Sequence, residues 1–506
     1  MLASIRSAAL VGIDAYDVAV EVDAAPGLPQ WTLVGLPLGA VKESRERVGA
    51  ALVNSGFTLP PRRITINLAP ADVRKDGTAF DLPMALGILV ATGQLAPESV
   101  DGRLYAGELG LDGVIRSIRG ALSIARLAAC TGLGEVVIPP ANIREAARVS
   151  SLRIAAPFDL RSLVAELREG VLTRAVADEP TANVSNDSLD LADVVGQDGA
   201  KRALEVAAAG GHNLLMIGPP GAGKTMLARR LPGILPPLTE EESLEVIAIQ
   251  SVAGMLASDA VEHLTRLFRA PHHSISSAGL IGGGTSPRPG EVSLAHNGVL
   301  FLDEMLEFPR SVLDGLRQPM EDGRVVIARA AMSVKYPARF TLVGATNPCP
   351  CGRLGDPTGT CTCSAVDAER YANRISGPLI DRIDMRVNAG AVALRELTGQ
   401  RNGEPSAVIR DRVSVARAKQ LHRFRRLRSV TCNAHAPGRW IDENGSVSSE
   451  GRAFLQAAAN ALSLSARGYH RVLKVARTVA DLDDAPAVEA EHIAEALRYR
   501  APASSR

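Results

Sequence analysis

The chain has 506 residues, 46% of them hydrophobic and 22% charged, with a formal net charge of +1 at pH 7. This length is too great for one hydrophobic core and predicts about three domains. The balanced charge argues against a uniformly basic surface that binds nucleic acid, so any such surface must be local. The aromatic content of 3% argues against binding single strands mainly by base stacking.

No segment of the chain is typical of an export signal or a membrane span. The apolar run at residues 8–13 has no basic leader before it and no cleavage site after it. No apolar run approaches the roughly 18 residues that cross a bilayer. We therefore expect a cytoplasmic protein without membrane contact.

The sequence pattern divides the chain into three regions and a linker. Residues 1–172 mix short β-rich runs with helical ones, which indicates a compact α/β domain. Residues 173–188 are polar and aperiodic, as in a linker. Residues 189–391 alternate helices with buried strand-type runs, which is typical of a parallel sheet. Residues 392–506 keep only helical periodicity and predict a helical domain.

A glycine-rich loop follows the buried-strand run at residues 214–217 and precedes a helical segment. This is the context in which a G-x-x-x-x-G-K-[ST] loop binds the phosphates of a nucleotide. We expect backbone N–H groups to surround the phosphates, Lys224 to reach the β- and γ-phosphates of ATP, and the Thr225 hydroxyl to bind Mg²⁺. The alternative is a glycine turn without a ligand. The loop consists of Gly218, Pro219, Pro220, Gly221, Ala222, Gly223, Lys224 and Thr225.

Polar side chains follow two further buried strands. Asp303 and Glu304 end the apolar run at residues 299–302, and Asn347 ends the run that begins at Phe340. We expect Asp303 to hold Mg²⁺, Glu304 to activate the attacking water, and Asn347 to orient that water. Each strand end alone is weak evidence, but three in this order predict an ATP-hydrolysing site.

Four of the six cysteines lie close together in two C-x-C pairs. Four thiolates at this spacing can enclose a structural Zn²⁺, and the metal would order the loop that follows Asn347. The C-x-C spacing is tighter than the usual C-x₂-C, and reduced thiols packed in a loop are the alternative. The candidate ligands are Cys349, Cys351, Cys361 and Cys363.

A basic run extends from Arg410 to Arg428 with a single acid, Asp411. A solvated helix face is the default interpretation of such a run. A surface that binds the phosphates of DNA is the alternative, because DNA neutralises dense positive charge by releasing counterions. The sequence leaves both interpretations open.

Further motifs accompany the glycine-rich loop and the polar strand ends. The full set is Gly218–Thr225, Val299–Glu304, Thr346–Asn347, Ser376–Asp384, Arg269–Ser274, Gly282–Gly284, Pro289–Gly298, Asn347–Gly352 and Ser465–Arg471. Together these motifs resemble the magnesium-chelatase branch of the AAA+ ATPases, and within it the ComM/YifB family, over nearly the whole chain. The resemblance implies a P-loop AAA+ core, in which a parallel sheet has helices on both faces, followed by a helical lid and preceded by an α/β module similar to the proteolytic domain of Lon.

The resemblance assigns two arginines to the reaction. It implies that Arg382 is the finger that reaches the ATP of a neighbouring subunit and that Arg467 is the second sensor in the lid. A guanidinium beside the γ-phosphate stabilises charge in the transition state. The alternatives are an ion pair of Arg382 with Asp381 or Asp384, and a plain surface position for Arg467. Arg374 is another candidate for the neighbour-facing arginine.

The N-terminal region resembles Lon without its catalytic residues. The position of the Lon nucleophile falls on Ala79, and that of its general-base lysine falls on Leu122. A Ser–Lys dyad needs a hydroxyl and an amine, which neither residue supplies. We therefore expect a scaffold or binding module and no peptidase activity.

The ComM/YifB resemblance implies a homo-oligomeric ring, a hexamer by analogy with that family, that uses ATP and Mg²⁺ to remodel DNA. The implied activity is branch migration or helicase action at branched or single-strand/duplex junctions, during recombination of incoming DNA in transformation (competence). On this interpretation the insert at residues 252–297 and the hairpin at residues 325–339, with Arg329 and Lys335, face the ring channel; ordinary surface loops are the alternative.

A metal-insertion or protein-remodelling chaperone, as in magnesium chelatase, is the competing function. Ala79 and Leu122 contradict a third class, an ATP-dependent protease. The ATPase motifs are common to all three classes and do not discriminate among them.

Overall fold

A computed structural model describes residues 2–176, 189–256, 265–284, 287–329, 332–355, 360–390, 403–427 and 430–500. The chain forms two compact units. Unit 1 consists of residues 1–183, 240–264 and 328–336, and unit 2 consists of residues 184–239, 265–327 and 337–506. Most of the predicted linker, residues 177–188, lies outside the described residues. In the described part of the chain, no helix has the length and apolar character needed to cross a membrane.

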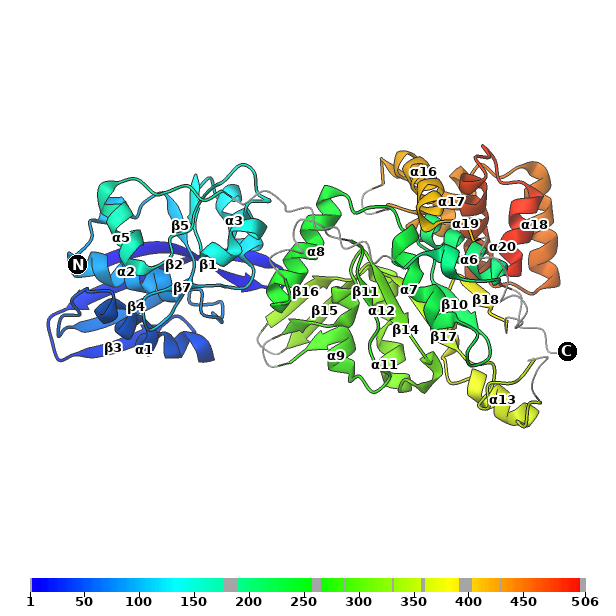
Figure 1. The fold of residues 1–506 in the computed structure, drawn as a ribbon, viewed down its shortest axis with the longest axis horizontal. Helices are drawn as coiled ribbons and strands as arrows, with labels where there is room; N and C mark the ends of the chain where they lie inside the picture. The colour runs from blue at the N-terminus through cyan, green and yellow to red at the C-terminus, as the bar shows by residue number, and fades with distance from the viewer. Residues whose placement is uncertain are drawn as a thin grey trace. The chain divides into compact units, whose positions relative to one another are not determined.

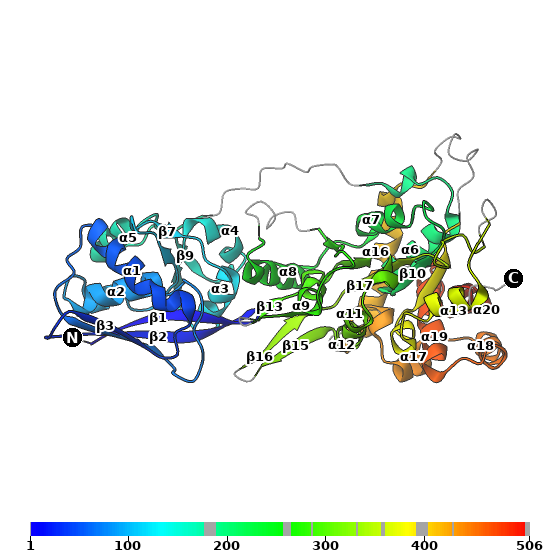
Figure 2. The same ribbon diagram turned by 90° about the horizontal axis from the view of Figure 1, so that it is seen from below.

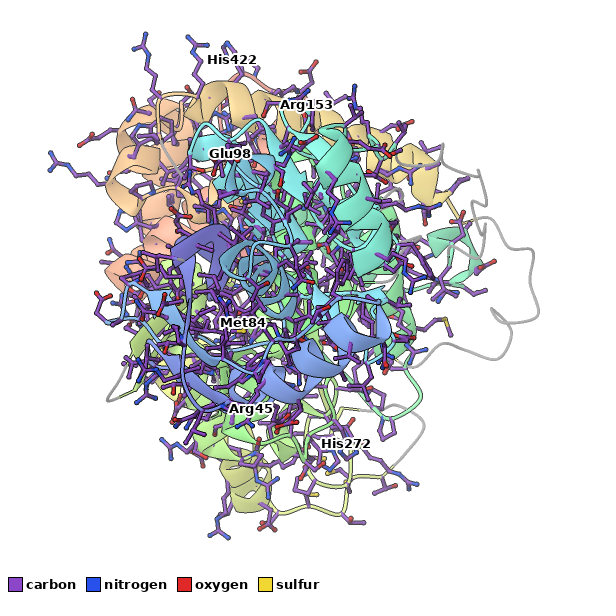
Figure 3. The ribbon with its side chains drawn as sticks, turned by 90° about the vertical axis from the view of Figure 1, so that its left-hand side faces the viewer. Arg45, Met84, Glu98, Arg153, His272 and His422 are labelled. Atoms are coloured by element: carbon purple, nitrogen blue, oxygen red, sulfur yellow. The ribbon has the colours of Figure 1, made fainter. Side chains whose placement is uncertain are left out.

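Unit 1 is built on a four-stranded sheet in the order β1-β2-β4-β3. The β1–β2 and β2–β4 pairs are antiparallel, and β3 runs parallel to β4. Alternate residues of β4 are buried, which explains its period-two pattern of apolar residues. The apolar helix α2 packs on β1 and β2 (Figure 2), and Met84 of α2 lies in this core while Arg45 of α1 is exposed (Figure 3). The elements are β1 (Leu2–Val11), β2 (Asp14–Ala25), β3 (Gln30–Val34), α1 (Gly39–Asn54), β4 (Arg63–Ala69) and α2 (Asp81–Ala91).

The rest of the N-terminal part of unit 1 contains a parallel three-stranded sheet, β5-β8-β9, and the short antiparallel pair β6–β7. Helix α3 packs against β1 and β2 as well as against β8. These elements are η1 (Pro97–Ser99), β5 (Arg103–Tyr105), β6 (Glu108–Leu109), β7 (Ile115–Arg116), α3 (Ala121–Cys130), β8 (Glu135–Val137), η2 (Pro140–Asn142), α4 (Ile143–Ala146), β9 (Arg153–Ala155) and α5 (Leu160–Glu169).

Helix α8 (Glu240–Ala253) belongs to unit 1, although its sequence lies within the predicted ATPase region. Ile247 and Ala248 of α8 form a fully buried cluster with Leu122 of α3. The Gly120 N–H donates to the Ser251 hydroxyl at 2.8 Å. Unit 1 thus contains a helix that comes, in sequence, a short connection after α7 (Lys224–Ile234), the helix that follows the glycine-rich loop. The contiguous predicted regions did not include this arrangement.

Unit 2 contains a five-stranded sheet in the order β11-β14-β17-β10-β18 (Figure 1). Every neighbouring pair in it is parallel, as predicted. All four residues of β14 and all six of β17 are buried, which matches their continuous apolar runs and a sheet covered on both faces. The strands are β10 (Leu214–Ile217), β11 (Phe268–Arg269), β14 (Val299–Leu302), β17 (Thr341–Thr346) and β18 (Met385–Asn388).

The remaining segments between these strands form short elements. The predicted hairpin at residues 325–339 is observed as β15 paired with β16. The elements are η3 (Leu191–Asp193), α6 (Asp198–Gly210), α7 (Lys224–Ile234), α9 (Ser277–Ile281), β12 (Gly282–Gly283), β13 (Arg288–Pro289), α10 (Glu291–Leu294), η4 (Met305–Glu307), α11 (Arg310–Gly315), α12 (Arg317–Asp322), β15 (Arg324–Arg329), β16 (Met332–Pro337), α13 (Ala365–Ala372) and α14 (Gly377–Ile380).

The C-terminal region is helical, as predicted, and shares one hydrophobic core with the sheet. Side chains of Ser448 and Ser465 cap α18 and α19 by accepting from backbone N–H groups three residues on. Burial of Arg477 is supported by its pairing with Asp481 of the same helix. The elements are α16 (Ser406–Phe424), η5 (Asn433–His435), α17 (Gly438–Asn444), α18 (Ser449–Ala461), α19 (Ala466–Leu482) and α20 (Ala490–Arg498).

If α8 is part of the core of unit 1, truncating its buried face must destabilise that unit. We expect Ile247→Ala to lower the free energy of unfolding by about 2–5 kcal/mol, because it leaves a cavity beside Leu122. Leu111→Ala removes a similar volume from a side chain that is 56% exposed and serves as the control. Urea unfolding followed by circular dichroism measures both, and equal effects would contradict the packing of α8.

Candidate nucleotide site

The glycine-rich loop connects the end of β10 to the start of α7. Gly221 and Gly223 adopt φ values of +78° and +81°, a left-handed conformation that glycine tolerates best. A Cβ atom on Gly218 would lie 2.0 Å from the carbonyl oxygen of Ala389. At residue 218, a side chain would collide with the neighbouring backbone. At residues 221 and 223, the positive φ angle favours glycine.

Lys224 and Asn347 meet at this loop, as the sequence predicts for the ends of β10 and β17. The Lys224 Nζ donates to the Gly218 and Pro219 carbonyl oxygens at 2.7 and 2.9 Å and to Asn347 Oδ1 at 3.2 Å. Burial lowers the pKa of Lys224, against the opposing effect of Asp303 and Glu304. The ammonium group is therefore held by oxygen acceptors at the mouth of the loop.

Thr225 and Asp303 form the second meeting point. The Thr225 hydroxyl donates to Asp303 Oδ2 at 2.7 Å, and the Glu304 N–H donates to Asp303 Oδ1 at 3.0 Å. A hydroxyl and a carboxylate side by side are oxygen ligands of the kind that Mg²⁺ takes in nucleotide sites. The residues present thus fit the cation.

Glu304 lies at the edge of the site with its carboxylate exposed to solvent. Its φ is +48°, which is uncommon for a residue other than glycine and marks a strained position. Its Oε2 lies 3.9 Å from Nδ1 of His273. We did not assign a role to His273 from the sequence, although it falls within the family motif Arg269–Ser274.

Arg382 is not paired with either of the predicted partners. Its Nη2 forms an ion pair with Glu321, and its Nη1 donates to the Pro378 carbonyl at 2.8 Å. Its buried Nε–H has no hydrogen-bond partner among the described residues. The alternative candidate Arg374 binds the Leu306 carbonyl and Glu307 at 3.2 and 3.0 Å.

Arg382 and Arg467 line one cavity of about 600 Å³ in unit 2. Arg339, Arg471 and Lys474 also line it, and Arg467 is exposed. Among the described residues that line the cavity, none belongs to the glycine-rich loop. The structure therefore brings the two predicted arginines together, at a place separate from the loop of their own chain.

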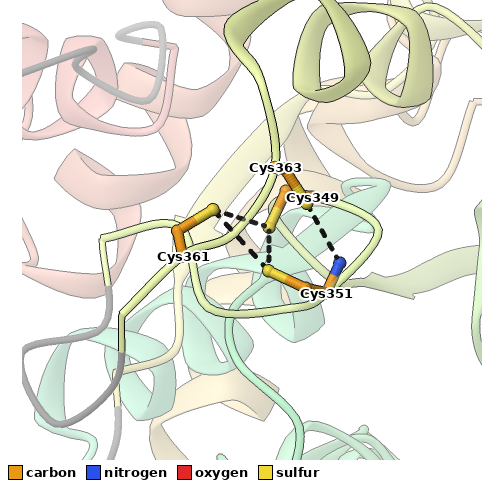
Figure 4. Close-up of side chains that lie close together, drawn as sticks. All are labelled: Cys349, Cys351, Cys361 and Cys363. Carbon is orange, nitrogen blue, oxygen red and sulfur yellow. Dashed lines mark hydrogen bonds between the residues drawn. The ribbon is translucent and has the colours of Figure 1, made fainter.

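The four clustered cysteines converge as the sequence predicts (Figure 4). The sulfurs of Cys349, Cys351 and Cys361 lie 3.4–3.7 Å from one another, and all four sulfurs lie within 4.8 Å of one another. A tetrahedral Zn²⁺ site with Zn–S bonds of about 2.3 Å separates its sulfurs by about 3.8 Å. The donor set and spacing therefore fit Zn²⁺.

The acidities of the thiols also suit a cation. Backbone N–H groups of Arg353 and Thr362 lower the pKa of Cys351 to about 5. The Cys351 N–H lowers the pKa of Cys363, but the neighbouring thiols Cys351 and Cys349 and partial burial outweigh it and raise this pKa to about 12. A negative charge on one cysteine sulfur thus makes deprotonation of the next cysteine less favourable. A divalent cation bound between the sulfurs would offset this repulsion.

Four of the eight cations between Arg410 and Arg428 bind acceptors inside unit 2, which neither sequence interpretation included. Arg412 binds Glu205 at 2.8 Å, and Arg417 donates to the Ala208 carbonyl at 2.7 Å. Lys419 pairs with Asp484, and Arg423 pairs with Asp481 at 2.5 Å. Arg410 and Arg426 are exposed, while Arg428 lies outside the described residues.

The structure describes only part of the insert and of the hairpin for which the sequence predicts roles in a ring. In the insert at 252–297, residues 257–264 and 285–286 lie outside the described residues. In the hairpin, Lys335 is exposed, whereas the side chain of Arg329 is not among those described. In the N-terminal module, Ala79 is partly buried and Leu122 is fully buried under α8.

Known proteins similar to this chain cover it from end to end. Family models match it in three parts: "Magnesium chelatase, subunit ChlI" at residues 190–397, "Subunit ChlI of Mg-chelatase" at residues 20–142, and "Magnesium chelatase, subunit ChlI C-terminal" at residues 403–500. "Competence protein ComM" of Haemophilus influenzae is 44% identical over 509 residues, which cover 99% of this chain and 97% of that relative.

Two further relatives mark the breadth of the similarity. YifB of Salmonella typhimurium is 42% identical over 507 residues, with 99% of this chain and 97% of the relative covered. The magnesium-chelatase 38 kDa subunit of Rhodobacter capsulatus is 28% identical over 172 residues, 31% of this chain and 49% of that subunit. The full-length similarity and the family models agree with the parallel sheet and its glycine-rich loop. The chain therefore belongs to the ComM/YifB family of magnesium-chelatase-like AAA+ ATPases.

Proposed function

We propose that this ATPase hydrolyses ATP at the ends of β10, β14 and β17. Lys224 binds the β- and γ-phosphates, Thr225 and Asp303 hold Mg²⁺, Glu304 accepts a proton from the attacking water, and Asn347 orients that water. Mg²⁺ held by these residues would neutralise charge that develops on the transferred phosphoryl group. The observation that carries this proposal is the pair of contacts Lys224–Asn347 and Thr225–Asp303, which joins all three strand ends.

Glu304→Gln separates binding from hydrolysis. We expect it to retain ATP binding and to lower kcat by about 10²–10⁴-fold, because the amide does not accept the proton. Lys224→Ala should lose ATP binding instead. Fluorescent-nucleotide titration and phosphate release measure the two steps, with Glu443→Gln in α17 as the control. Normal turnover by Glu304→Gln would show that another group is the base.

We propose further that the chain forms a ring, hexameric as the family resemblance implies, in which each ATP lies between two subunits. The cavity lined by Arg382 and Arg467 includes no described residue of the chain's own glycine-rich loop, which supports a role for both guanidinium groups at a neighbour's γ-phosphate. Among the described residues, the Nε–H of Arg382 has no hydrogen-bond partner, so the present contacts of this guanidinium leave one of its donors unsatisfied. Arg382 would exchange Glu321 for the phosphate when the ring assembles.

Mixing inactive variants tests the shared site. We expect Lys224→Ala chains mixed with Arg382→Ala chains to recover part of the missing ATP hydrolysis, because a mixed ring contains interfaces with one intact loop and one intact arginine. Lys224→Ala mixed with Glu304→Gln is the matched control: both changes lie on the loop side, so every interface stays defective. Phosphate release over a range of mixing ratios measures recovery, and equal behaviour of the two mixtures would exclude a finger supplied by the neighbour.

We propose that the ring remodels DNA, by branch migration or helicase action in recombination of incoming DNA, in the cytoplasm. The support is the full-length similarity to a protein named for competence. The similarity to a magnesium-chelatase subunit covers 31% of this chain, which favours this function over metal insertion. Because most charges of α16 are paired internally, the DNA contacts fall on exposed cations such as Lys335, Arg410 and Arg426. Ala79 and Leu122 support a non-proteolytic N-terminal module.

A four-way DNA junction tests the motor. We expect the protein with ATP and Mg²⁺ to move the branch point and DNA to stimulate ATP hydrolysis. Lys335→Ala should weaken duplex binding and lower the log–log salt slope by roughly 0.9 for each phosphate that is no longer neutralised, while basal hydrolysis persists. Lys42→Ala in α1 is the control. An assembled, ATP-hydrolysing ring that neither binds nor moves the junction would refute this function and favour a chaperone.

We propose that Cys349, Cys351, Cys361 and Cys363 bind a structural Zn²⁺. Its support is the convergence of the four sulfurs within 4.8 Å and the mutual opposition of their charges. Four thiolates without an open position hold the metal as a cross-link and leave it no role as a Lewis acid.

A further inference from the structure

The cysteine cluster starts at the ATP site itself. Strand β17 ends at Thr346, Asn347 follows, and Cys349 is the next residue but one. Cys349 is fully buried. The segment between the strand and the first two cysteines therefore carries a proposed catalytic group at one end and proposed metal ligands at the other.

This segment also packs on the glycine-rich loop. Gly352, directly after Cys351, adopts a φ of +78°. A Cβ atom at this position would lie 2.6 Å from Pro220 Cδ and 3.8 Å from Asn347 Cγ. The turn that carries Cys349 and Cys351 thus packs on Pro220 of the phosphate-binding loop and lies near the side chain of Asn347. A side chain at Gly352 would collide with Pro220.

The cysteines link this turn to the returning part of the loop. The Cys351 N–H donates to Cys363 Sγ at 3.4 Å, and the Cys361 sulfur lies 3.7 and 3.6 Å from those of Cys349 and Cys351. Within the turn, the Gly352 N–H donates to the Cys349 carbonyl at 2.9 Å. Thiolates as close as these repel one another. A metal bound to all four sulfurs would therefore hold the turn at Cys349 and Cys351 against the segment that carries Cys361 and Cys363.

We propose that the metal at the four cysteines positions Asn347, so that the rate of ATP hydrolysis depends on a second metal distinct from Mg²⁺. The cysteines are positioning residues: they act on the reaction through Asn347 and the contact of Gly352 with Pro220. This inference rests on the proposed role of Asn347. Its physical basis is that a displacement of about 1 Å in a positioning group lowers turnover by about 10²-fold, whereas ATP binding depends on Lys224 and on backbone groups of the loop.

The experiment uses the full-length protein and the variants Cys351→Ser and Cys361→Ser. Elemental analysis measures zinc, fluorescent-nucleotide titration measures ATP binding, and phosphate release gives kcat and KM. Cys130→Ser, which removes an exposed cysteine of unit 1, is the matched control. We expect one zinc per chain and normal kcat in the control, and in the cluster variants no zinc, nearly unchanged ATP affinity and a kcat lowered by about 10–100-fold.

A double-mutant cycle separates positioning from general stabilisation. In an Asn347→Ala background, Cys351→Ser should cause little further loss of kcat, because the group that the metal positions is already absent. A merely structural metal would instead lower kcat by the same factor in both backgrounds, or would reduce ATP binding and the unfolding temperature together, and either result would overturn the proposal.

The remaining outcomes are also decisive. A wild-type protein free of zinc would overturn both the metal site and its coupling to hydrolysis. Absence of zinc from Cys351→Ser without any change in kcat would overturn the coupling and leave the metal site intact. Asn347→Ala with normal kcat would overturn the role of Asn347 in the proposed function, and the inference with it.

Discussion

The nucleotide site depends on the parallel hydrogen-bond register of three buried strands. Leu302 of β14 pairs with Gly344 of β17, and Ile217 of β10 pairs with Thr346 of β17. These pairings align the carboxyl ends of the strands, after which the glycine-rich loop, Asp303 and Asn347 follow. Burial on both faces fixes the register, since a shift would carry polar strand ends into the core.

Close packing around Gly344 shows how little space there is between β17 and its neighbours. A Cβ atom at this position in the middle of β17 would lie 2.7 Å from Met305 Sδ and 3.0 Å from Leu215 Cδ1. The central strand therefore packs against its neighbours with no space for a side chain. Because β17 is held in this way, Asn347 begins from a fixed point, and the rigidity of the site originates in the hydrophobic core.

Features that depend on local pattern could be predicted from the sequence. The glycine-rich loop, the carboxylates after β14 and the C-x-C pairs are short motifs, and their neighbouring apolar runs show which ends of the strands they occupy. The partners of Arg382 and α16 could not be predicted in this way. Asp381 and Asp384 lie within two residues of Arg382 in the sequence, but Arg382 pairs with Glu321, which is 61 residues away. Asp384 instead binds Arg471 at 2.6 Å. Such contacts depend on how distant segments fold together.

Helix α8 has a consequence for the covalent connectivity of the molecule. The N-terminal module and α8 are joined by burial of Leu122 against Ile247 and Ala248 and by the Gly120–Ser251 hydrogen bond. Cleavage of the peptide chain between residues 177 and 188 would therefore yield two fragments that remain associated, because the second fragment supplies a helix to the core of the first. A fragment that ends at residue 172 would lack that helix and would expose apolar surface, which favours aggregation. The module is thus separate in sequence but incomplete without the chain that follows it.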